Sequence, residues 1–412
     1  MTNDQYRLFD NPRVSREAAP PADCADFLDR ESCALAAEEI RAWPDYRPTP
    51  LRTLPGLAKA AGIGELLYKD ESTRFGLGSF KALGGAYAVF RFLARELAAR
   101  GVPLPIDVST LMAGEHTEIV SGLTVACATD GNHGRSVAWG ARMFGCGCVI
   151  FIHAHVSEAR EAAIAAYGAR VVRVAGNYDD SVARAAEDAG ANGWQVISDT
   201  SYPGYTEVPR EVMAGYTVML DEIIGEIGDS SPPTHVFVQG GVGGLAAAVC
   251  APLWRHYGES RPRFIVVEPE NAACLYASAE TGAPTHIDGD LDTVMAGLSC
   301  GEPSLIAWPL LDAGTHWFMH IPDGSALATM GRLAAGEGGD IPVVGGESGV
   351  AGLAGLLALC SDPEAARRVG LDTSARVLVI GTEGDTDAEL YREIVGESGD
   401  SVRARQVIAP PA

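Results

Sequence analysis

Short apolar runs alternate with amphipathic stretches along most of the chain, beginning near residue 65. Runs such as residues 148–152 and 376–380 are rich in Val and Ile, which is typical of short buried strands. Residues 81–100 instead repeat apolar side chains at helical spacing, with Leu83, Ala86, Phe90, Leu93 and Leu97 on one face. Repeated strand–helix units of this kind predict a parallel sheet that is covered by helices on both faces.

The same pattern predicts the individual elements. Strands are expected at residues 65–70, 124–128, 148–152, 170–174, 194–198, 235–239, 263–268 and 376–380. Helices are expected at residues 81–100, 134–144, 158–167, 179–189, 207–227, 243–257 and 387–395. The first 45 residues are rich in Pro and Ala with weak periodicity, so we expect an irregular arm there.

Composition then narrows the class of protein. The chain has 412 residues, enough for two or three domains, and a net charge of −23 that argues against nucleic acid or an anionic membrane as partner. No apolar run follows a basic region at the start, and the apolar stretches at 236–254 and 343–360 are broken by several Gly residues. We therefore expect neither a secretory signal nor a membrane span.

The numbers of cysteine and lysine residues give information on the redox state of the thiols and on a possible amine nucleophile. Nine cysteines, Cys274 and Cys300 among them, are scattered without an export signal, which favours reduced thiols in the cytoplasm. Of the 31 basic residues only Lys59, Lys69 and Lys81 are lysines. An amine nucleophile is a position where arginine cannot replace lysine, although chance survival of three lysines is the simpler explanation.

Four segments place candidate chemistry after predicted strands, where parallel sheets bind ligands. The first, residues 69–81, ends in Ser79-Phe80-Lys81 at the start of a helix, whose dipole would lower the pKa of Lys81. The second is the turn Thr129-Asp130-Gly131-Asn132-His133-Gly134, where backbone amides can hold a carboxylate and Asn132 a ring hydroxyl. Alone, the first is also compatible with a solvated turn, and the second with a helix cap.

The third segment, Gln239-Gly240-Gly241-Val242-Gly243-Gly244, leads from a strand into a helix and predicts a phosphate-binding loop. The same loop fits a dinucleotide fingerprint that ends at Ala246, with Glu268 as the acidic residue, so an NAD-dependent oxidoreductase is an alternative. In the fourth segment, residues 381–386, the Thr382 hydroxyl could form a hydrogen bond with a ring nitrogen. The alternative interpretation is an ordinary turn between a strand and a helix.

Together, the lysine segment, the Gly-Asn-His turn and the glycine-rich loop resemble the fold type II pyridoxal-phosphate enzymes over about residues 45–400. This group includes threonine and serine dehydratases, tryptophan synthase β and cysteine synthase. The resemblance implies pyridoxal 5′-phosphate bound to Lys81 as an aldimine and Asn132 beside its 3′-oxygen. It also implies phosphate on residues 240–244 and Thr382 near the pyridine nitrogen.

Further residues narrow the resemblance. Dehydratases usually carry a small residue where Asp130 stands, and the segments 194–200, 204–206, 295–303 and 382–386 resemble the diaminopropionate ammonia-lyases. By this resemblance Asp130 and Asp199 are acid/base residues beside Lys81, and the substrate is bound by Ser79, Thr129, Asp130, Gly131 and Asp199. The second ammonium of 2,3-diaminopropionate gives such carboxylates a physical purpose.

The resulting expectation is a two-domain α/β protein with twisted, mostly parallel sheets flanked by helices, similar to tryptophan synthase β. Residues 1–85 and 206–412 would form a large cofactor-binding domain, and residues 86–205 a small inserted one. The expected reaction is elimination of ammonia through an aminoacrylate, giving pyruvate and two ammonia, by a cytoplasmic homodimer without metal. A dehydratase acting on serine, threonine or hydroxyaspartate is the nearest alternative, and a catalytically silent binding protein is a more distant one.

Overall fold

The computed structural model describes residues 6–129, 131–228 and 231–406. Contacts within the chain divide it into two compact units. Unit 1 comprises Met1–Asp26, Pro48–Thr73 and Met219–Ala412, and unit 2 comprises Phe27–Arg47 and Arg74–Val218. Within residues 6–129, 131–228 and 231–406, no helix has both the length and the apolar character needed to cross a bilayer.

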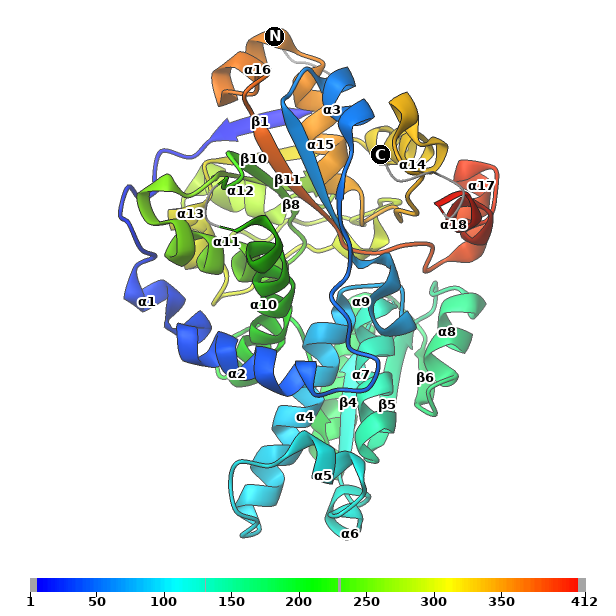
Figure 1. Cartoon of the computed structure of the whole chain (residues 1–412). Coiled ribbons are helices and arrows are strands. Elements are labelled where there is room, and N and C mark those ends of the chain that lie inside the picture. The colour runs from blue at the N-terminus through cyan, green and yellow to red at the C-terminus, as the bar shows by residue number, and fades with distance from the viewer. Residues whose placement is uncertain (1–5, 130, 229–230, 407–412) are drawn as a thin grey trace. The chain divides into compact units, whose positions relative to one another are not determined.

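Unit 1 is built on a sheet with seven strands among the described residues, in the order β1-β10-β9-β8-β11-β3-β2. The five central strands are parallel, and β1 and β2 pair antiparallel at the two edges. Of these strands, Figure 1 labels β1, β10, β8 and β11. The strands are β1 (Arg7–Asp10), β2 (Leu51–Thr53), β3 (Glu65–Asp70), β8 (His235–Gln239), β9 (Arg263–Pro269), β10 (Trp317–Ile321) and β11 (Arg376–Gly381).

Small residues let the helix α15 (Ala351–Cys360) lie directly on this sheet. A Cβ at Gly352 would come within 2.9 Å of the Phe237 carbonyl oxygen, and one at Gly355 within 2.8 Å of the Val267 side chain. The other helices of unit 1 are α1 (Ala22–Ala25), α3 (Pro55–Ala61), α11 (Gly244–Tyr257), α12 (Cys274–Thr281), α13 (Trp308–Gly314), α14 (Asp323–Ala335), α16 (Pro363–Val369), α17 (Ala388–Val395) and α18 (Gly399–Gln406).

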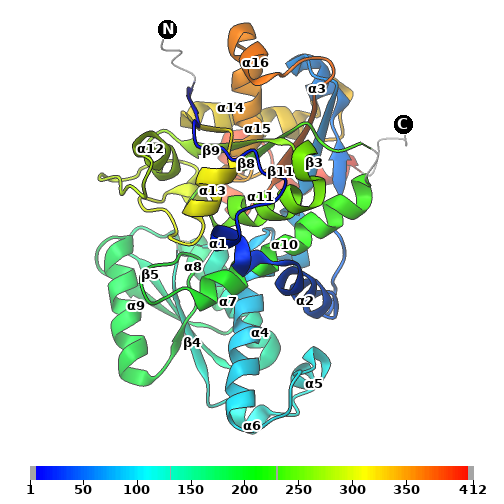
Figure 2. The ribbon, with the colours of Figure 1, turned by 90° about the vertical axis from the view of Figure 1, so that its left-hand side faces the viewer.

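Unit 2 holds a parallel sheet in the order β6-β5-β4-β7, and β4 and β5 run side by side in Figures 1 and 2. These strands are β4 (Thr124–Ala128), β5 (Gly147–His153), β6 (Arg170–Val174) and β7 (Gln195–Val196). Its helices are α2 (Arg30–Arg41), α4 (Lys81–Ala99), α5 (Val108–Met112), α6 (Thr117–Val120), α7 (Asn132–Phe144), α8 (Glu158–Ala165) and α9 (Tyr178–Asn192). The long helix α10 (Glu207–Ile227) contains the residues at which the chain passes from unit 2 to unit 1.

The α/β class and the parallel sheets are confirmed, and most predicted elements lie within two residues of their observed bounds. The prediction of an irregular N-terminal arm is wrong, because this segment contains β1 and α2.

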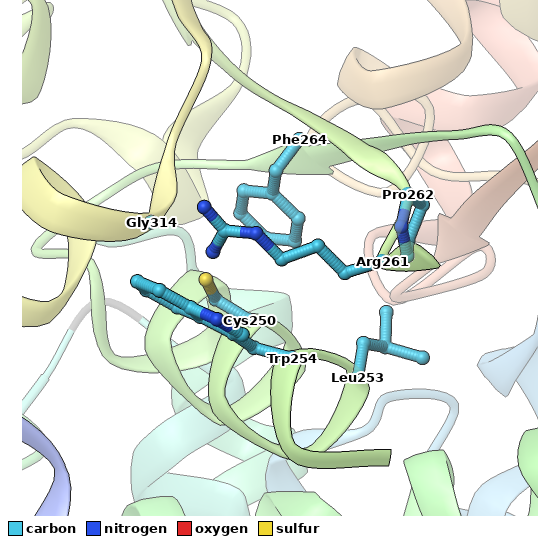
Figure 3. A pocket seen from close by; sticks show the side chains of 7 residues that line it. All are labelled: Cys250, Leu253, Trp254, Arg261, Pro262, Phe264 and Gly314. Carbon is cyan, nitrogen blue, oxygen red and sulfur yellow. The ribbon is translucent and has the colours of Figure 1, made fainter. Parts of the chain in front are cut away.

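The N-terminal segment is also held by side chains of unit 1. Trp254 Nε1 donates to the Glu17 carbonyl at 2.8 Å, and Arg261 Nη2 donates to the Ser15 carbonyl at 2.6 Å. Figure 3 shows the Arg261 side chain above Trp254, and its guanidinium lies 3.4 Å from the ring centre.

The compact units do not follow the predicted boundaries at residues 85 and 205. Residues 74–85 belong to unit 2, because Lys81 begins the helix α4 that packs on α7. The segment Phe27–Arg47 joins unit 2 as well, where Glu39 accepts hydrogen bonds from Tyr87 Oη at 2.7 Å and from Arg91 Nη1 at 2.9 Å. The cofactor-binding role given to the larger predicted domain stays a prediction.

Candidate active site

Lys81 is the first residue of α4, and its backbone is fixed from two sides within unit 2. The Ser79 hydroxyl accepts a hydrogen bond from the Lys81 backbone N–H at 3.2 Å, so Ser79 caps the helix. The Ser136 hydroxyl, from α7, donates to the Lys81 carbonyl at 2.7 Å and accepts from the Ala86 N–H at 3.0 Å. The lysine therefore starts from a backbone held by both its own helix cap and the neighbouring helix.

Glycines allow the helices around Lys81 to approach this closely. A Cβ at Gly140 of α7 would lie 2.7 Å from the Ala86 Cα, and a Cβ at Gly85 of α4 would lie 2.5 Å from the Ser136 hydroxyl oxygen. A Cβ at Gly215 would lie 2.1 Å from the Leu83 carbonyl oxygen. Side chains at these positions would push the helices apart, so the glycines set the position of α4.

The side chain of Lys81 forms an ion pair with Asp199, which follows β7. Both side chains are about one-fifth exposed, at 20% and 21%. Burial raises the pKa of Asp199, but the Lys81 ammonium outweighs it, so the pKa of this carboxyl lies well below its usual range. Lys81 Nζ also lies 5.3 Å from the ring centre of Phe80 and 5.8 Å from that of Tyr216. These aromatic faces favour a cation here.

The turn after β4 brings further predicted residues to the same unit. The Thr129 hydroxyl accepts from the N–H groups of Gly131 and Gly134, both at 3.2 Å, and so caps α7. A Cβ at Gly134 would lie 2.2 Å from the Thr129 methyl carbon, which explains glycine at that position. Asn132 is the first residue of α7. Asp130 lies outside the described residues.

His133 is a residue to which the sequence analysis assigned no role. Its side chain is 7% exposed, its Nε2 lies 3.0 Å from the Ile197 carbonyl oxygen, and its Nδ1 lies 3.9 Å from Asp199 Oδ2. Burial lowers the pKa of His133, and the nearby Lys81 ammonium lowers it further against the opposing effect of Asp199. In the sequence, only its position in the Gly-Asn-His turn, one residue beyond Asn132, pointed to a place for His133 near the site.

Unit 1 contains the glycine-rich loop, between β8 and α11. Gly241 and Gly243 have φ angles of 60° and 97°, in the left-handed region that favours glycine. A Cβ at Gly240 would lie 2.5 Å from Glu268 Cγ, and one at Gly243 would lie 2.9 Å from a Leu311 methyl carbon. Residues 240–244 thus form a tight turn at the N-terminus of α11, where the helix dipole attracts an anion such as a phosphate.

Thr382 lies beside this loop, because β8 and β11 are neighbouring parallel strands whose carboxyl ends meet at one edge. Gln239 Nε2 donates to Thr382 Oγ1 at 3.2 Å and to the carbonyl oxygens of Gly349 and Ile380 at 2.7 and 2.8 Å. The two amide protons of Gln239 are shared among these three acceptors, and the amide holds Thr382 beside the ends of β8 and β11. No local pattern in the sequence indicates this role of Gln239.

Glu268 does not serve as the acidic residue of a dinucleotide site. Its carboxylate oxygens accept from the backbone N–H groups of Leu275 and Tyr276 at 2.9 and 2.7 Å, at the start of α12. The residue is fully buried, and burial raises its pKa to about 8 against the effect of these two hydrogen bonds. A carboxyl used in this way is not available to a ribose hydroxyl.

The remaining candidates are less informative. His316 and His320 are four residues apart, the spacing of neighbours on one helix face, but they lie just before and within the strand β10 and so share no helix. His316 Nδ1 accepts from the Phe264 N–H at 3.0 Å. Across the described part of the chain, no three His, Cys, Asp or Glu side chains are grouped closely enough to hold a metal ion. The described cysteines form no disulfide, and Cys274 donates to the Gly241 carbonyl at 3.5 Å.

Comparison with known proteins gives a family match that covers the candidate residues of both units. Residues 42–382 match the model of the family described as pyridoxal-phosphate dependent enzyme. This chain belongs to that family. It is 39% identical over 401 residues to a diaminopropionate ammonia-lyase of Escherichia coli K12, covering 96% of this chain and 97% of the relative. A D-serine dehydratase of Shigella flexneri is more distant, at 25% identity over 361 residues.

Solved structures agree with this family assignment. The diaminopropionate ammonia-lyase of Escherichia coli in complex with D-serine matches with a TM-score of 0.86 at 35% identity, covering 95% of this chain and 97% of that one. The same enzyme with an aminoacrylate–pyridoxal-phosphate azomethine intermediate matches with a TM-score of 0.83 at 36% identity, over the same shares of both chains. The fold type II class and pyridoxal phosphate as cofactor are therefore confirmed, and the NAD-dependent alternative has no support.

The residues of each unit fit the cofactor of the family. In unit 2, the Lys81 amine is anchored at a helix start beside an ionised carboxylate. In unit 1, glycines 240, 241, 243 and 244 form a turn too narrow for side chains at residues 240 and 243, at the N-terminus of a long helix. An amine for the aldehyde and a cradle for the phosphate are the two features that this cofactor requires.

Proposed function

We propose that this protein eliminates ammonia from 2,3-diaminopropionate, giving pyruvate and two molecules of ammonia as a carbon–nitrogen lyase. The observation that carries the proposal is the carboxylate of Asp199, which the adjacent Lys81 ammonium keeps ionised. A diamine substrate brings a second cation that such a carboxylate can attract, whereas the hydroxyl of serine needs none. The 39% identity to a diaminopropionate ammonia-lyase across 96% of the chain supports the same substrate.

The proposed roles divide between the two sets of residues. Lys81 holds the cofactor and transfers the α-proton, and Asp199 exchanges protons with the substrate amine. Asp130 would act with them from the other face of Cα, which would admit both enantiomers, and this role rests on the resemblance alone. The cofactor would be bound by Asn132, Gly240, Gly241, Val242, Gly243, Gly244 and Thr382, and the substrate by Ser79, Thr129, Gly131, Asp130 and Asp199.

Each group has one task in the proposed reaction. When bound, pyridoxal phosphate delocalises the charge that remains on the substrate Cα after its proton is removed. Lys81 holds that proton on Nζ, and the Asp199 carboxylate lies beside it to stabilise the resulting ammonium. The β-amine must be protonated when its bond to carbon breaks, so that it leaves as neutral ammonia, and the ionised Asp199 carboxylate stabilises that ammonium. Thr129 and Ser79 already cap their helices and so present fixed hydroxyl groups.

Product release from two substrates tests the proposal. The purified protein, loaded with pyridoxal phosphate, is given DL-2,3-diaminopropionate or DL-serine, and pyruvate and ammonia are measured. We expect pyruvate and ammonia mainly from the diamine, in a ratio of two ammonia to one pyruvate. Turnover of serine alone would show that the protein is a dehydratase, the activity named for its 25% identical relatives.

The finer expectations belong to the same proposal. We infer a homodimer in the cytoplasm, on the resemblance to the fold type II enzymes and on the scattered odd number of cysteines. Light scattering on the purified protein measures the oligomeric state directly. A mass of one chain, 43.1 kDa, would contradict the dimer.

A further inference from the structure

The hydrogen bond between His133 and Ile197 determines which ring nitrogen of the histidine carries its proton. A carbonyl oxygen can only accept, so at 3.0 Å from the Ile197 carbonyl Nε2 must be the N–H donor. Burial lowers the pKa of the ring, which is therefore neutral near pH 7. In a neutral imidazole with the proton on Nε2, Nδ1 has a bare lone pair. His133 thus presents an acceptor at Nδ1.

That acceptor lies close to a second one. Nδ1 is 3.9 Å from Asp199 Oδ2, and within the described residues no hydrogen-bond donor reaches it. Two acceptors cannot bond to each other, and a buried acceptor without a partner destabilises its surroundings. A single proton placed between Nδ1 and Oδ2 would satisfy both atoms. The distance of 3.9 Å requires only a small side-chain movement for such a bond.

Lys81 determines whether this proton is needed. While Lys81 is an ammonium ion, its charge compensates Asp199, and a proton on the His133–Asp199 pair is disfavoured. Its role as the amine that holds the cofactor requires Lys81 to give up a proton. A charged Asp199 carboxylate would then lie in a mostly buried place without the cation that had stabilised it, so Asp199 takes up a proton more readily.

We propose that His133 is a positioning residue that shares one proton with Asp199 whenever Lys81 is uncharged. An Nζ–H bond of Lys81 breaks and an Oδ2–H bond of Asp199 forms, and this proton is then donated to Nδ1 of His133. When Lys81 takes a proton again, the same steps run in reverse, so that no charge is created or lost. The inference rests on the proposed function only for its use in catalysis, because the proton sharing itself needs no substrate.

The two tyrosines beside this cluster do not change their protonation state near neutral pH. Burial raises the pKa values of Tyr205 and Tyr216, so both phenols are uncharged there. Cys127, from β4, acts on both tyrosines, and Tyr202 acts on Tyr205. Asp130 lies outside the described residues and is kept unchanged in every variant below.

The direct test compares Lys81→Met with Lys81→Arg, in the full chain labelled with ¹⁵N-histidine. Both variants lose the amine, but only Lys81→Arg keeps a cation beside Asp199. The ¹⁵N signals of His133, identified by their loss in His133→Asn, are titrated with pyridoxal phosphate present. We expect His133 to bind its proton about tenfold more tightly in Lys81→Met than in Lys81→Arg. Equal proton affinities in the two variants would overturn the proposal.

A second measurement uses the active holoenzyme and a matched buried histidine. His235 is also buried, with Nε2 2.9 Å from the Val369 carbonyl oxygen, but its Nδ1 is bonded to the Thr234 hydroxyl at 2.8 Å. We expect His133→Asn to shift the pH profile of kcat, and His235→Asn to retain the wild-type profile. Identical profiles for wild type and His133→Asn would overturn a role in turnover. Inactivity of the wild type on the diamine would instead refute the proposed function and leave the titration of His133 as the test.

Discussion

Replacing Gly140 by alanine tests how closely α7 and α4 must approach to hold Lys81 in place. The added Cβ would lie 2.7 Å from the Cα and 2.8 Å from the Cβ of Ala86, whereas carbon atoms in contact prefer about 3.5–4.0 Å. The helices would have to separate by roughly 1 Å, since neither Ala86 atom can rotate away. Overpacking of this kind costs about 1–3 kcal/mol.

A control in the same unit isolates this cost from the intrinsic preference of helices for alanine. Gly190 lies in α9, is exposed, and has no atom within 4 Å of a Cβ built on it. Gly190→Ala should stabilise the protein by about 0.5–1 kcal/mol, because alanine loses less backbone freedom than glycine on folding. Both variants gain this term, so the difference between them measures the packing cost alone.

The assay is urea denaturation followed by circular dichroism, with the pyruvate assay on the same preparations. We expect Gly140→Ala to be about 1–3 kcal/mol less stable than Gly190→Ala. Its kcat should fall roughly 10- to 100-fold, since a displacement of about 1 Å moves the Lys81 amine from its working position. Equal denaturation midpoints for the two variants, at equal slopes, would refute the close approach of the two helices.

Three further predictions concern buried charge. Asp199→Asn should lower kcat/KM for diaminopropionate by roughly 100-fold or more, and affect serine turnover less, in the pyruvate assay. Lys69→Met should destabilise the protein by about 3–5 kcal/mol in urea because it leaves Glu222 buried without its cation, and Lys69→Met/Glu222→Leu should recover most of that loss. Glu268 has a folded-state pKa of about 8, above its ordinary value of 4.5, so its stabilisation is complete below pH 4.5 and is lost as the pH rises through 8. In the wild type, this group should therefore lower the unfolding free energy by on the order of 1–4 kcal/mol between pH 5 and 8. Glu268→Gln should remove that decrease, and an unchanged pH dependence in the variant would contradict the raised pKa.

The parts of the fold that were predictable from sequence are those whose signal is local. Strands such as β8 and β11 are buried on both faces, so they read as continuous apolar runs. The strand β1 has only four residues, none of them buried, and it exists because it pairs with β10 more than 300 residues later in the chain. No local pattern contains that information. The strand β10 was not among the predicted elements, because a five-residue apolar strand is too short to show its period.

The candidate site shows the same limit at the level of single atoms. The residue types in the turn 129–134 and in the loop 240–244 pointed to a cofactor, because turns and glycines have local causes. The tautomer of His133 and the donor role of Gln239 are set by carbonyl oxygens of Ile197, Gly349 and Ile380, far along the chain. Such partners are brought together by the fold, and only the structure reveals them.

The three lysines show how far an argument from residue type can reach. Lys69 is fully buried, and its Nζ donates to Glu222 at 2.6 Å and to the Thr49 carbonyl at 2.7 Å. An arginine has five donors in a rigid fork, and this site supplies acceptors for a compact ammonium. Lys81 meets an equally specific demand, whereas Lys59 is exposed in the last turn of α3, where arginine would serve as well. Scarcity of lysine therefore marked two sites that need a small cation, at Lys69 and Lys81, and the partner of each amine decides between a structural ion pair and a reactive group.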